Sequence, residues 1–575
     1  MNNPVIKLVE DLRGALSLDE ITPIVAQSFL LLKRTGVENL SDSLASNMLW
    51  MEFDELNKQF KEFGHHLPVI DVEKFESFIG EFVENLVELY KLGGVNDGDL
   101  LQVLDYFAIA QGKNGMTVVP KEVVRLGKGL LPNTKESVYC PFESSYSFAE
   151  AMDGDVGYEA QLTSSIAMAL TRGELLNKVG YDIRQSDPLS NPKFITHGGL
   201  EQFEHSIAFP PFNLKLGKEI PKDLWGRFVE KSSNGYVYQL RHMLAHSYSH
   251  VVVCVANSFL TSSVSAEAAF KQDMLEKGWL KAVISLPGNL LNSTSIPFSI
   301  IVLDKGHHGH STLLIDVSGD YFTAEGKVRT IKSLSNVGQI LDIYHDDEVS
   351  DFSALVTAEE IKQNNMSWMP SRYVMTQDDR NMTDKLAEFK MVNLADIAEF
   401  IRPQMLKSVV EGETFSEVVL SNLNEIGQLT GELKKVKVKQ NNKASKQTLR
   451  KGDILLSSRG TVGRVGLVEK DEKNMLASQI FTVIRIKPYA SITPEFIYQY
   501  LVSELGQWQL NNLVSGSAQP VLSPKDLNAL QIPSLPLSEM KKAEKVRTQV
   551  IKKHQQLEHI RDEINQLNAN MWFVS

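Results

Sequence analysis

The feature that most constrains this chain is the alternation of short apolar runs with helical stretches from residue 116 to about residue 305. Short apolar runs are typical of buried strands, and the longer periodic stretches between them are typical of helices. Such alternation favours an α/β fold in which helices cover a parallel sheet. The strands that we predict include residues 137–140, 250–256, 280–285 and 297–303, with one more at 312–316.

Different patterns flank this region. Residues 1–115 have apolar residues at three- and four-residue spacing, which predicts a helical domain. After a largely polar connector at 311–390, residues 391–537 have short β-rich segments and turns, and residues 538–575 predict one long helix. With the α/β region placed at 116–310, the sequence predicts a multidomain α/β protein.

Charge and composition exclude several classes of protein. The formal net charge is −12, but residues 391–575 carry about +5, which leaves about −17 for the rest of the chain. An anionic partner is therefore expected in the C-terminal third. Two cysteines, Cys140 and Cys254, are too few for a disulfide scaffold or a cysteine-built zinc site. With no membrane-spanning run and no signal peptide at the start, we expect a cytoplasmic protein.

The most basic segment, residues 434–451, contains eight cations and no acid. Such a cluster matches the electrostatic footprint of a protein that binds the phosphate backbone of DNA. The alternative is a solvated loop without a ligand. The side chains that we expect to contact phosphates are Lys434, Lys435, Lys437, Lys439, Lys443 and Lys446.

Residues 452–468 place a strand, a glycine-rich turn and a second strand in order, and three further segments follow at 477–480, 514–523 and 532–539. Together these four motifs resemble the target-recognition domain of type I restriction specificity subunits. The resemblance implies sequence-specific recognition of duplex DNA, in which arginine side chains reach phosphate or guanine. The residues that we expect at this interface are Arg459, Arg464, Gln479, Ser517 and Gln519.

The C-terminal helix has an apolar stripe with charged flanks, as in a coiled coil. In the resembled specificity subunits, the helix after each recognition domain packs antiparallel against its counterpart and sets the distance between two half-sites. A single domain and helix therefore predict a homodimer on a palindromic, bipartite site. The alternative is a monomer in which the stripe packs on the N-terminal helices. The residues expected at the dimer seam are Val546, Val550, Leu557, Ile560 and Ile564.

The α/β region begins with residues 116–126 and 138–148, which resemble the opening of adenine-N6 DNA methyltransferases, specifically type I modification subunits. The family pattern is Asp-Pro-Ala-Cys-Gly-Ser-Gly-Gly-Phe, whose glycines let the backbone approach S-adenosylmethionine. Aligned on Pro141, Ser145 and Phe148, this chain lacks the acid and all three glycines. The residues at those four positions are Cys140, Ser144, Tyr146 and Ser147. The resemblance thus implies a blocked cofactor loop.

Of the later methyltransferase motifs, two binding acids are retained and the catalytic motif is changed. Glu159 falls where the family has an acid that binds ribose hydroxyls, and Asp187 falls where an Asp meets the adenine. The family's catalytic Asn-Pro-Pro-Phe accepts hydrogen bonds from the target amine. Phe209 has no acceptor, so the amine would be buried unpaired at a cost of roughly 1–3 kcal/mol. Phe212 could still stack on a flipped base. The corresponding motif here is Phe209, Pro210, Pro211 and Phe212.

We therefore interpret the chain as a degenerate modification subunit with a Rossmann-like methyltransferase core, fused to half of a specificity subunit. The expected protein recognises DNA for a separate nuclease, motor or other effector of a restriction-like or antiphage defence system, with no cofactor and no catalytic residue. No metal is expected either, because neither the tract 305–310 nor the set His242, His246 and His250 favours a shared site. An active methyltransferase that uses Glu159 and Asp187, and a protein-binding scaffold, are the alternatives.

Overall fold

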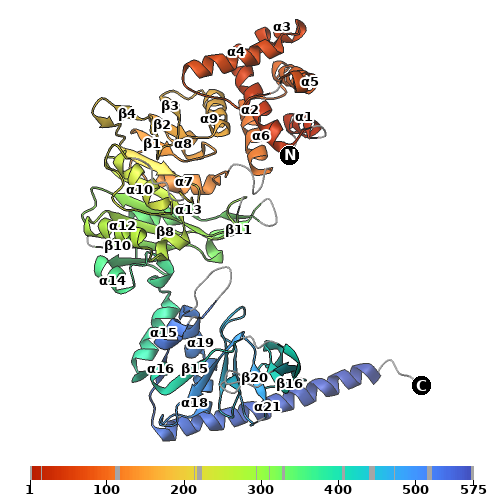
Figure 1. The fold of residues 1–575 in the computed structure, drawn as a ribbon, viewed down its shortest axis with the longest axis vertical. Coiled ribbons are helices and arrows are strands. Elements are labelled where there is room, and N and C mark those ends of the chain that lie inside the picture. The colour runs from red at the N-terminus through yellow and green to blue at the C-terminus, as the bar shows by residue number, and fades with distance from the viewer. Residues whose placement is uncertain are drawn as a thin grey trace. The chain divides into compact units, whose positions relative to one another are not determined.

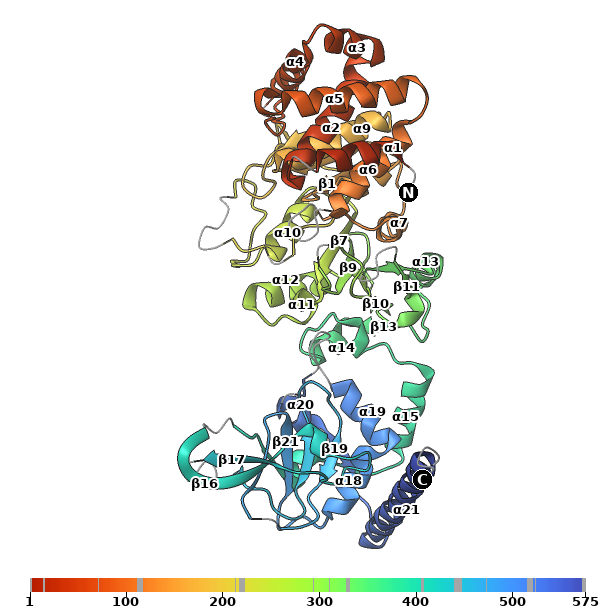
Figure 2. The same ribbon diagram turned by 90° about the vertical axis from the view of Figure 1, so that its right-hand side faces the viewer.

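The computed structural model divides into two compact units, Met1–Met375 and Thr376–Ser575, which we call unit 1 and unit 2. Their elements are shown in Figures 1 and 2. The division falls inside the connector predicted at 311–390. The residues described are 3–13, 16–70, 72–110, 117–212, 214–216, 223–292, 294–309, 311–326, 331–404, 408–438, 447–471, 473–513, 521–522 and 524–570.

Unit 1 begins with a helical region, as predicted. The longest interface to the rest of the unit is made by α2, which lies along α9 (Thr163–Leu175). Apolar residues of α2 are buried there, and the Thr171 hydroxyl donates to the carbonyl oxygen of Ala26 at 3.0 Å. The helices of this region are α1 (Pro4–Leu12), α2 (Leu18–Thr35), α3 (Val37–Ala45), α4 (Leu49–Glu62), α5 (Val72–Lys91) and α6 (Asp97–Ala110).

The rest of unit 1 is a nine-stranded sheet in the order β13-β10-β8-β9-β7-β6-β1-β2-β3, with helices on its faces (Figure 1). The five strands predicted from the sequence are confirmed as β1, β7, β8, β9 and β10. The strands are β1 (Val138–Pro141), β2 (Val156–Ala160), β3 (Tyr181–Gln185), β6 (His205–Ala208), β7 (His250–Ala256), β8 (Leu280–Ser285), β9 (Phe298–Asp304), β10 (Ser311–Asp316) and β13 (Ser353–Thr357).

Two features of this sheet differ from the prediction. The sheet is mixed rather than parallel, because β9 runs antiparallel to both β7 and β8. The connection from β8 to β9 contains no helix among its described residues, and a connection of that kind reverses the chain direction. Strand β13, which pairs antiparallel with β10, was not predicted, since its alternation of buried and exposed residues is irregular.

The remaining elements of unit 1 complete its layers. They are α7 (Lys121–Gly129), α8 (Ser147–Ala151), α10 (Tyr236–Ala245), α11 (Asn257–Thr261), α12 (Ser265–Glu276), α13 (Val337–His345), α14 (Ala358–Gln363) and the short hairpins β4 (Ile195–Thr196) with β5 (Gly199–Leu200) and β11 (Thr323–Glu325) with β12 (Lys332–Leu334). The connector at 311–390 therefore holds more than the one strand predicted at 312–316, because short helices and further strands also pack there.

Unit 2 contains a four-stranded sheet in the order β15-β21-β18-β19 and a three-stranded sheet in the order β17-β16-β20. The strands are β14 (Met391–Asn393), β15 (Ala398–Ile401), β16 (Ser408–Val418), β17 (Lys434–Val438), β18 (Ile454–Ser457), β19 (Val465–Leu467), β20 (Met475–Ala477), β21 (Phe481–Ile486) and β22 (Gln531–Pro533), where β14 pairs with β22. The predicted long helix is confirmed as α21 (Leu537–Asn570).

Helices within unit 2 were missed by the sequence prediction of β-rich segments and turns. The hydroxyl of Thr493 accepts from the backbone N–H of Phe496 and caps α18, whose apolar residues join the core of the four-stranded sheet. The helices are α15 (Gln377–Ala387), α16 (Leu394–Ile397), α18 (Pro494–Val502), α19 (Glu504–Leu513) and α20 (Pro524–Ala529). Among the described residues, no helix of either unit is long and apolar enough to cross a membrane.

Candidate functional site

The loop between β1 and α8 is where the resemblance places the cofactor, and Tyr146 fills it. Tyr146 has φ +63°, in the left-handed region that favours glycine, and its side chain is fully buried. Its ring packs edge-on against Tyr158 with 4.9 Å between centroids, and no described residue pairs with its hydroxyl. Burial raises the pKa of Tyr146. The position that a glycine occupies in the resembled family is therefore occupied by a core side chain.

A buried carboxylate, Glu143, closes the same loop. Its two oxygens accept the backbone N–H of Phe148 at 3.0 and 3.1 Å, at the start of α8. Burial raises the pKa of Glu143 to about 7, and backbone hydrogen bonds from residues 147–149 oppose that rise. The chain thus presents its own carboxyl group to the N–H groups that would hold an anionic ligand. Glu143 was not singled out from the sequence, where it stands at a Cys position of the family pattern.

The other predicted loop residues are held by internal contacts. Cys140 is buried in β1, which raises the pKa of its thiol, and Pro141 is the last residue of that strand. The Ser144 hydroxyl donates to the carbonyl oxygen of Thr117 at 3.2 Å. The hydroxyls of Ser145 and Ser147 lie 2.7 Å apart. In this arrangement the loop is closed on itself and does not fit the carboxypropyl end of S-adenosylmethionine.

The two predicted acids also have internal partners. Glu159, at the end of β2, accepts hydrogen bonds from the hydroxyls of Tyr139 and Ser186 and from the backbone N–H of Lys193 at 2.6 Å. Burial raises the pKa of Glu159. Asp187 accepts the backbone N–H of Leu189 at 3.0 Å and the hydroxyl of residue 190 at 2.6 Å, and so closes a turn. Ribose or adenine would have to displace these donors.

Glu159 is one end of a buried polar chain that sequence reasoning missed. The Tyr139 hydroxyl lies 2.8 Å from Nε2 of His242 on α10, and the Arg227 guanidinium donates to Nδ1 of the same ring at 2.7 Å. Arg227 is ion-paired with Asp223 at 3.0 Å. Burial lowers the pKa of His242 well below its ordinary value. Both ring nitrogens of His242 are engaged, and no group of three potential metal ligands is found among the described residues.

The segment after β6 carries the degenerate catalytic motif. Phe209 is buried, and its ring centroid lies 5.1 Å from that of Phe212 and 5.4 Å from that of Phe298 on β9. Phe212 remains partly exposed, while Pro210 is buried and Pro211 is exposed. The motif therefore forms an apolar cluster at the end of β6, and its side chains offer no acceptor to an amine.

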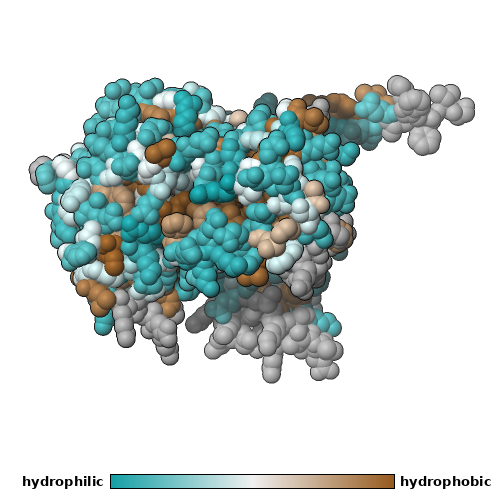
Figure 3. All heavy atoms as spheres, turned by 90° about the horizontal axis from the view of Figure 1, so that it is seen from above, coloured by the Kyte–Doolittle hydropathy of each residue, from teal (hydrophilic) through white to brown (hydrophobic). Residues whose placement is uncertain are grey.

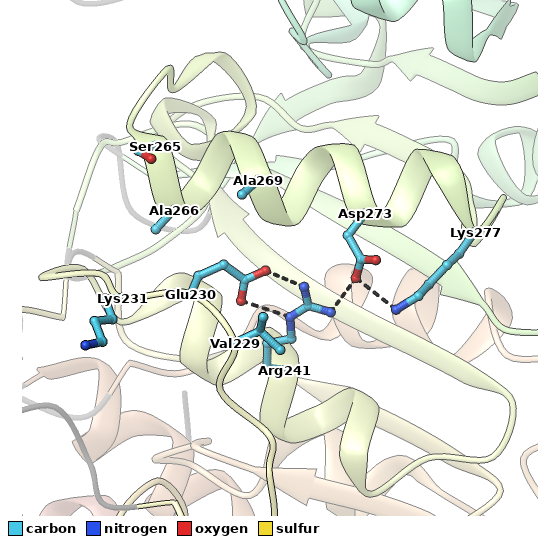
Figure 4. Close-up of a pocket in the computed structure, with 9 residues that line it drawn as sticks. All are labelled: Val229, Glu230, Lys231, Arg241, Ser265, Ala266, Ala269, Asp273 and Lys277. Atoms are coloured by element: carbon cyan, nitrogen blue, oxygen red, sulfur yellow. Dashed lines mark hydrogen bonds and ion pairs between the residues drawn. The ribbon is translucent and has the colours of Figure 1, made fainter.

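A cavity of about 590 Å³ in unit 1 lies between α10, α12 and residues 229–231 (Figure 4). At its centre, Arg241 pairs with Glu230 and, at 2.6 Å, with Asp273, which also pairs with Lys277 at 2.9 Å. These charges neutralise one another. None of the residues predicted from the sequence lines this cavity.

The basic run of unit 2 begins on β17, which is an edge strand. Lys434, Lys435 and Lys437 are exposed on it. The Lys435 ammonium donates to the hydroxyl of Ser416 at 2.8 Å, and Lys434 lies 3.5 Å from Glu417 on β16. Contacts of this kind at an exposed edge are weak. The predicted residues Lys439, Lys443 and Lys446 lie outside the described residues.

The predicted order of strand, glycine-rich turn and strand is confirmed, and the structure pairs β18 and β19 antiparallel. Arg459 on the turn and Gln479 after β20 are exposed. Arg464, by contrast, is half-buried, and its guanidinium donates to the carbonyl oxygens of Leu423 at 2.7 Å and Asn424 at 3.2 Å. The structure therefore leaves Arg459 open to a ligand and commits Arg464 to the protein's own loop. Ser517 and Gln519 lie outside the described residues.

Helix α21 has two different faces. Met540 and Arg547 are 4% exposed and face the core of unit 2. The predicted seam lies on another face, where its side chains are between 37% and 55% exposed, and apolar side chains show along the protruding end of α21 in Figure 3. The residues of this exposed stripe are Val546, Val550, Leu557, Ile560 and Ile564.

Comparison with known proteins covers both units. Residues 99–382 match the family model of N-6 DNA methylases, and residues 387–567 match that of the type I restriction modification DNA specificity domain. The chain is 27% identical over 382 residues to the type I restriction enzyme MjaVII methylase subunit of Methanocaldococcus jannaschii, covering 59% of this chain and 64% of that protein. It is 24% identical over 331 residues to the HindI methylase subunit of Haemophilus influenzae, covering 53% of this chain and 73% of that protein.

Among solved structures, the type I restriction-modification system methyltransferase subunit from Streptococcus thermophilus superposes with a TM-score of 0.51 at 17% identity, over 65% of this chain and 100% of that one. This likeness shows the fold of the methyltransferase core. The chain spans 64% of the length of the M. jannaschii relative. Its two matched segments follow each other with a gap of only four residues. The chain therefore contains an N-6 DNA methylase domain followed by a type I restriction modification DNA specificity domain.

Proposed function

We propose that this protein recognises a specific duplex DNA sequence through unit 2, while unit 1 keeps the fold of an N-6 methylase without methyl-transfer activity. The observation that carries the proposal is the closed loop after β1, in which Tyr146 and the Glu143 carboxylate take the space and the N–H groups expected for a cofactor. Phe209 adds a second, independent departure, because the target amine would find no side-chain acceptor.

Titration calorimetry with S-adenosylmethionine, followed by a methylation assay on diverse DNA, tests this part of the proposal. We expect no binding and no transfer of label into DNA. The single change Phe209→Asn should not restore transfer, because Tyr146 and Glu143 still close the loop. Transfer that disappears when the protein is heat-killed would contradict the proposal.

The second candidate function is an active adenine-N6 methyltransferase. The relatives named as methylase subunits favour it, as does the presence of Glu159 and Asp187 at the positions of the family's binding acids. For this function the donors now bonded to Glu159 would have to move when the cofactor binds. The same assay decides between the two, since only this candidate transfers label.

Recognition of DNA by unit 2 is supported by the lysines exposed on β17 and by Arg459 on the glycine-rich turn. In this proposal lysines hold the phosphate backbone, and the turn reads base edges. Any cleavage or translocation is supplied by a separate effector of a cytoplasmic defence system. A scaffold that binds only protein through unit 2 would leave the basic edge strand without a role.

The proposed assembly is a homodimer on a bipartite DNA site. The exposed stripe of α21 has the spacing of a coiled-coil seam, and pairing two copies would bury it. Light scattering of the full chain should give the mass of two copies, and Leu557→Glu combined with Ile564→Glu should give one. A wild-type mass of one chain at micromolar concentration, with and without DNA, would refute the homodimer.

A further inference from the structure

Helix α21 is bound to its recognition domain through one deeply buried polar side chain, Arg547. Its guanidinium donates to the carbonyl oxygen of Ile426 at 2.5 Å and to Oε1 of Glu469 at 2.9 Å. The guanidinium carbon lies 4.2 Å from the centre of the Tyr498 ring, and the Tyr498 hydroxyl donates to the same Ile426 carbonyl at 2.7 Å. A carbonyl, a carboxylate and a ring face therefore fix the plane of one guanidinium.

The other contacts of α21 are less directional. Ala543 and Met540, one and two turns before Arg547, pack against the apolar core of the four-stranded sheet. Ile551 and His554 are half-buried on the same face, and residues 555–568 are all exposed. Apolar contacts tolerate small rotations of a helix, whereas hydrogen bonds weaken steeply when their angles change. The direction in which the helix leaves the domain is thus set mainly at Arg547.

The loop that Arg547 contacts, residues 423–428, is also hydrogen-bonded to the glycine-rich hairpin. Arg464 donates to two carbonyls of this loop, and the backbone N–H of Leu467 on β19 donates to the carbonyl oxygen of Gly427 at 3.0 Å. Glu469, the carboxylate partner of Arg547, accepts from the side chain of Gln428 at 3.1 Å. Residues 423–428 therefore connect the turn that carries Arg459 to the helix that carries Arg547.

We propose that Arg547 is a positioning residue that sets the spacing between two DNA half-sites by fixing the angle of α21. This inference rests on the proposed function, in which two copies pair through the exposed stripe of that helix. The part of α21 that follows Arg547 and ends at Asn570 forms a lever of about 34 Å at about 1.5 Å per residue. A tilt of about 10° at its base moves the far end by about 6 Å, which is about two base pairs of DNA.

The first test is a selection of binding sites from a DNA library. Each library member carries two half-sites, and the spacer between them varies from none to about 15 base pairs. The full-length wild-type protein should select one spacer length. Arg547→Met keeps an unbranched, largely apolar side chain but removes the guanidinium and its donors, and should shift or broaden the preferred spacer by about one to two base pairs. The half-site sequence should stay the same. Lys552→Met, which removes one exposed charge from the same helix, is the matched control and should keep the wild-type spacer.

The second test measures the angle of the helix without DNA. Cys140 and Cys254 are buried, so spin labels attach to cysteines introduced at exposed Asn511 on α19 and Asp562 on α21. Labelled protein diluted into excess unlabelled protein reports the distance within one chain. The wild-type distance distribution should be narrow, and Arg547→Met should broaden or shift it. If circular dichroism shows that this variant does not fold, Glu469→Gln, which weakens one of the three contacts, is measured in both tests instead.

The outcomes separate the two levels of the proposal. A wild-type protein that selects no specific sequence would overturn the proposed function, and one that selects single, unpaired half-sites would overturn the homodimer and the spacing role. A sharply paired wild-type site whose spacer does not change in the variant would overturn the spacing role alone. An unchanged distance between the two spin labels would also overturn the spacing role, because contacts other than those of Arg547 would then fix the angle of α21. A shifted spacer together with a shifted distance supports the inference.

Discussion

The two units of this protein use their polar side chains in opposite ways. At the positions where unit 1 resembles a methylase, Glu143, Glu159 and Asp187 all accept hydrogen bonds from their own chain. In unit 2, Lys437 and Arg459 lie exposed at a sheet edge and a turn. A buried polar group needs a hydrogen-bond partner within the protein, whereas an exposed charge is solvated by water and stays available to a ligand at little cost in free energy. The difference teaches that a retained fold and a retained binding site are separate properties.

The largest effect that we expect comes from unit 2. Neutralising Lys434, Lys435, Lys437 and Lys439 together should weaken binding to every duplex, because each phosphate contact releases close to one counterion. The slope of log affinity against log salt should fall by about three to four if all four lysines contact phosphate. Affinity measured at several salt concentrations gives this slope.

The control for that experiment removes four exposed lysines of unit 1 instead, Lys61, Lys135, Lys231 and Lys362. Its slope should match that of the wild type, since unit 1 is acidic and is not expected to contact DNA. If the unit 2 variant also keeps the wild-type slope, the basic run is a solvated segment, and the comparison between the units loses its functional meaning.

The sequence predicts the positions of the buried strands better than it predicts the partners of the polar side chains. Strands β7 and β8 consist mostly of apolar residues, so both could be located from local composition. The reversal of β9 and the helix α18 depend on tertiary packing that no local pattern records. Arg464 shows the same limit at the site, because its type and position favour a DNA contact while its actual partners, Leu423 and Asn424, lie about forty residues away.

The pH dependence of stability tests whether the polar groups of unit 1 are buried and bonded to their own chain. Because burial raises the pKa of Glu143 from 4.5 to about 7, the folded state holds a proton that the unfolded chain releases above pH 4.5. This group therefore stabilises the fold less as pH rises from about 4.5 to 7, by up to about 3 kcal/mol. Glu143→Gln, which cannot ionise, should lack that decline. Denaturant unfolding of both proteins across this range measures the difference.

The difference between the two proteins is the informative quantity in that experiment. His205, His242 and His246 have pKa values lowered by burial, so their contribution to stability rises with pH over part of the same range. These histidines are present in both proteins and cancel when the curves are subtracted. Parallel curves for wild type and Glu143→Gln would show that the carboxylate is not buried in the loop as described.

The smallest effect that we expect is a change in stability when the hydroxyl of Tyr146 is removed. Tyr146 occupies a position that is glycine in the resembled family. The Tyr146 hydroxyl is buried, and no described residue pairs with it, whereas the Tyr158 hydroxyl donates to the carbonyl oxygen of Glu143 at 2.5 Å. Tyr146→Phe should therefore stabilise the protein by about 1 kcal/mol, because an unpaired buried group costs free energy. Tyr158→Phe, the same chemical change one ring away, should destabilise it by about 1 kcal/mol, because it leaves a buried carbonyl without that donor. Equal effects of the two changes in denaturant unfolding would mean that the Tyr146 hydroxyl is solvated, and that the loop opens far enough to admit a ligand.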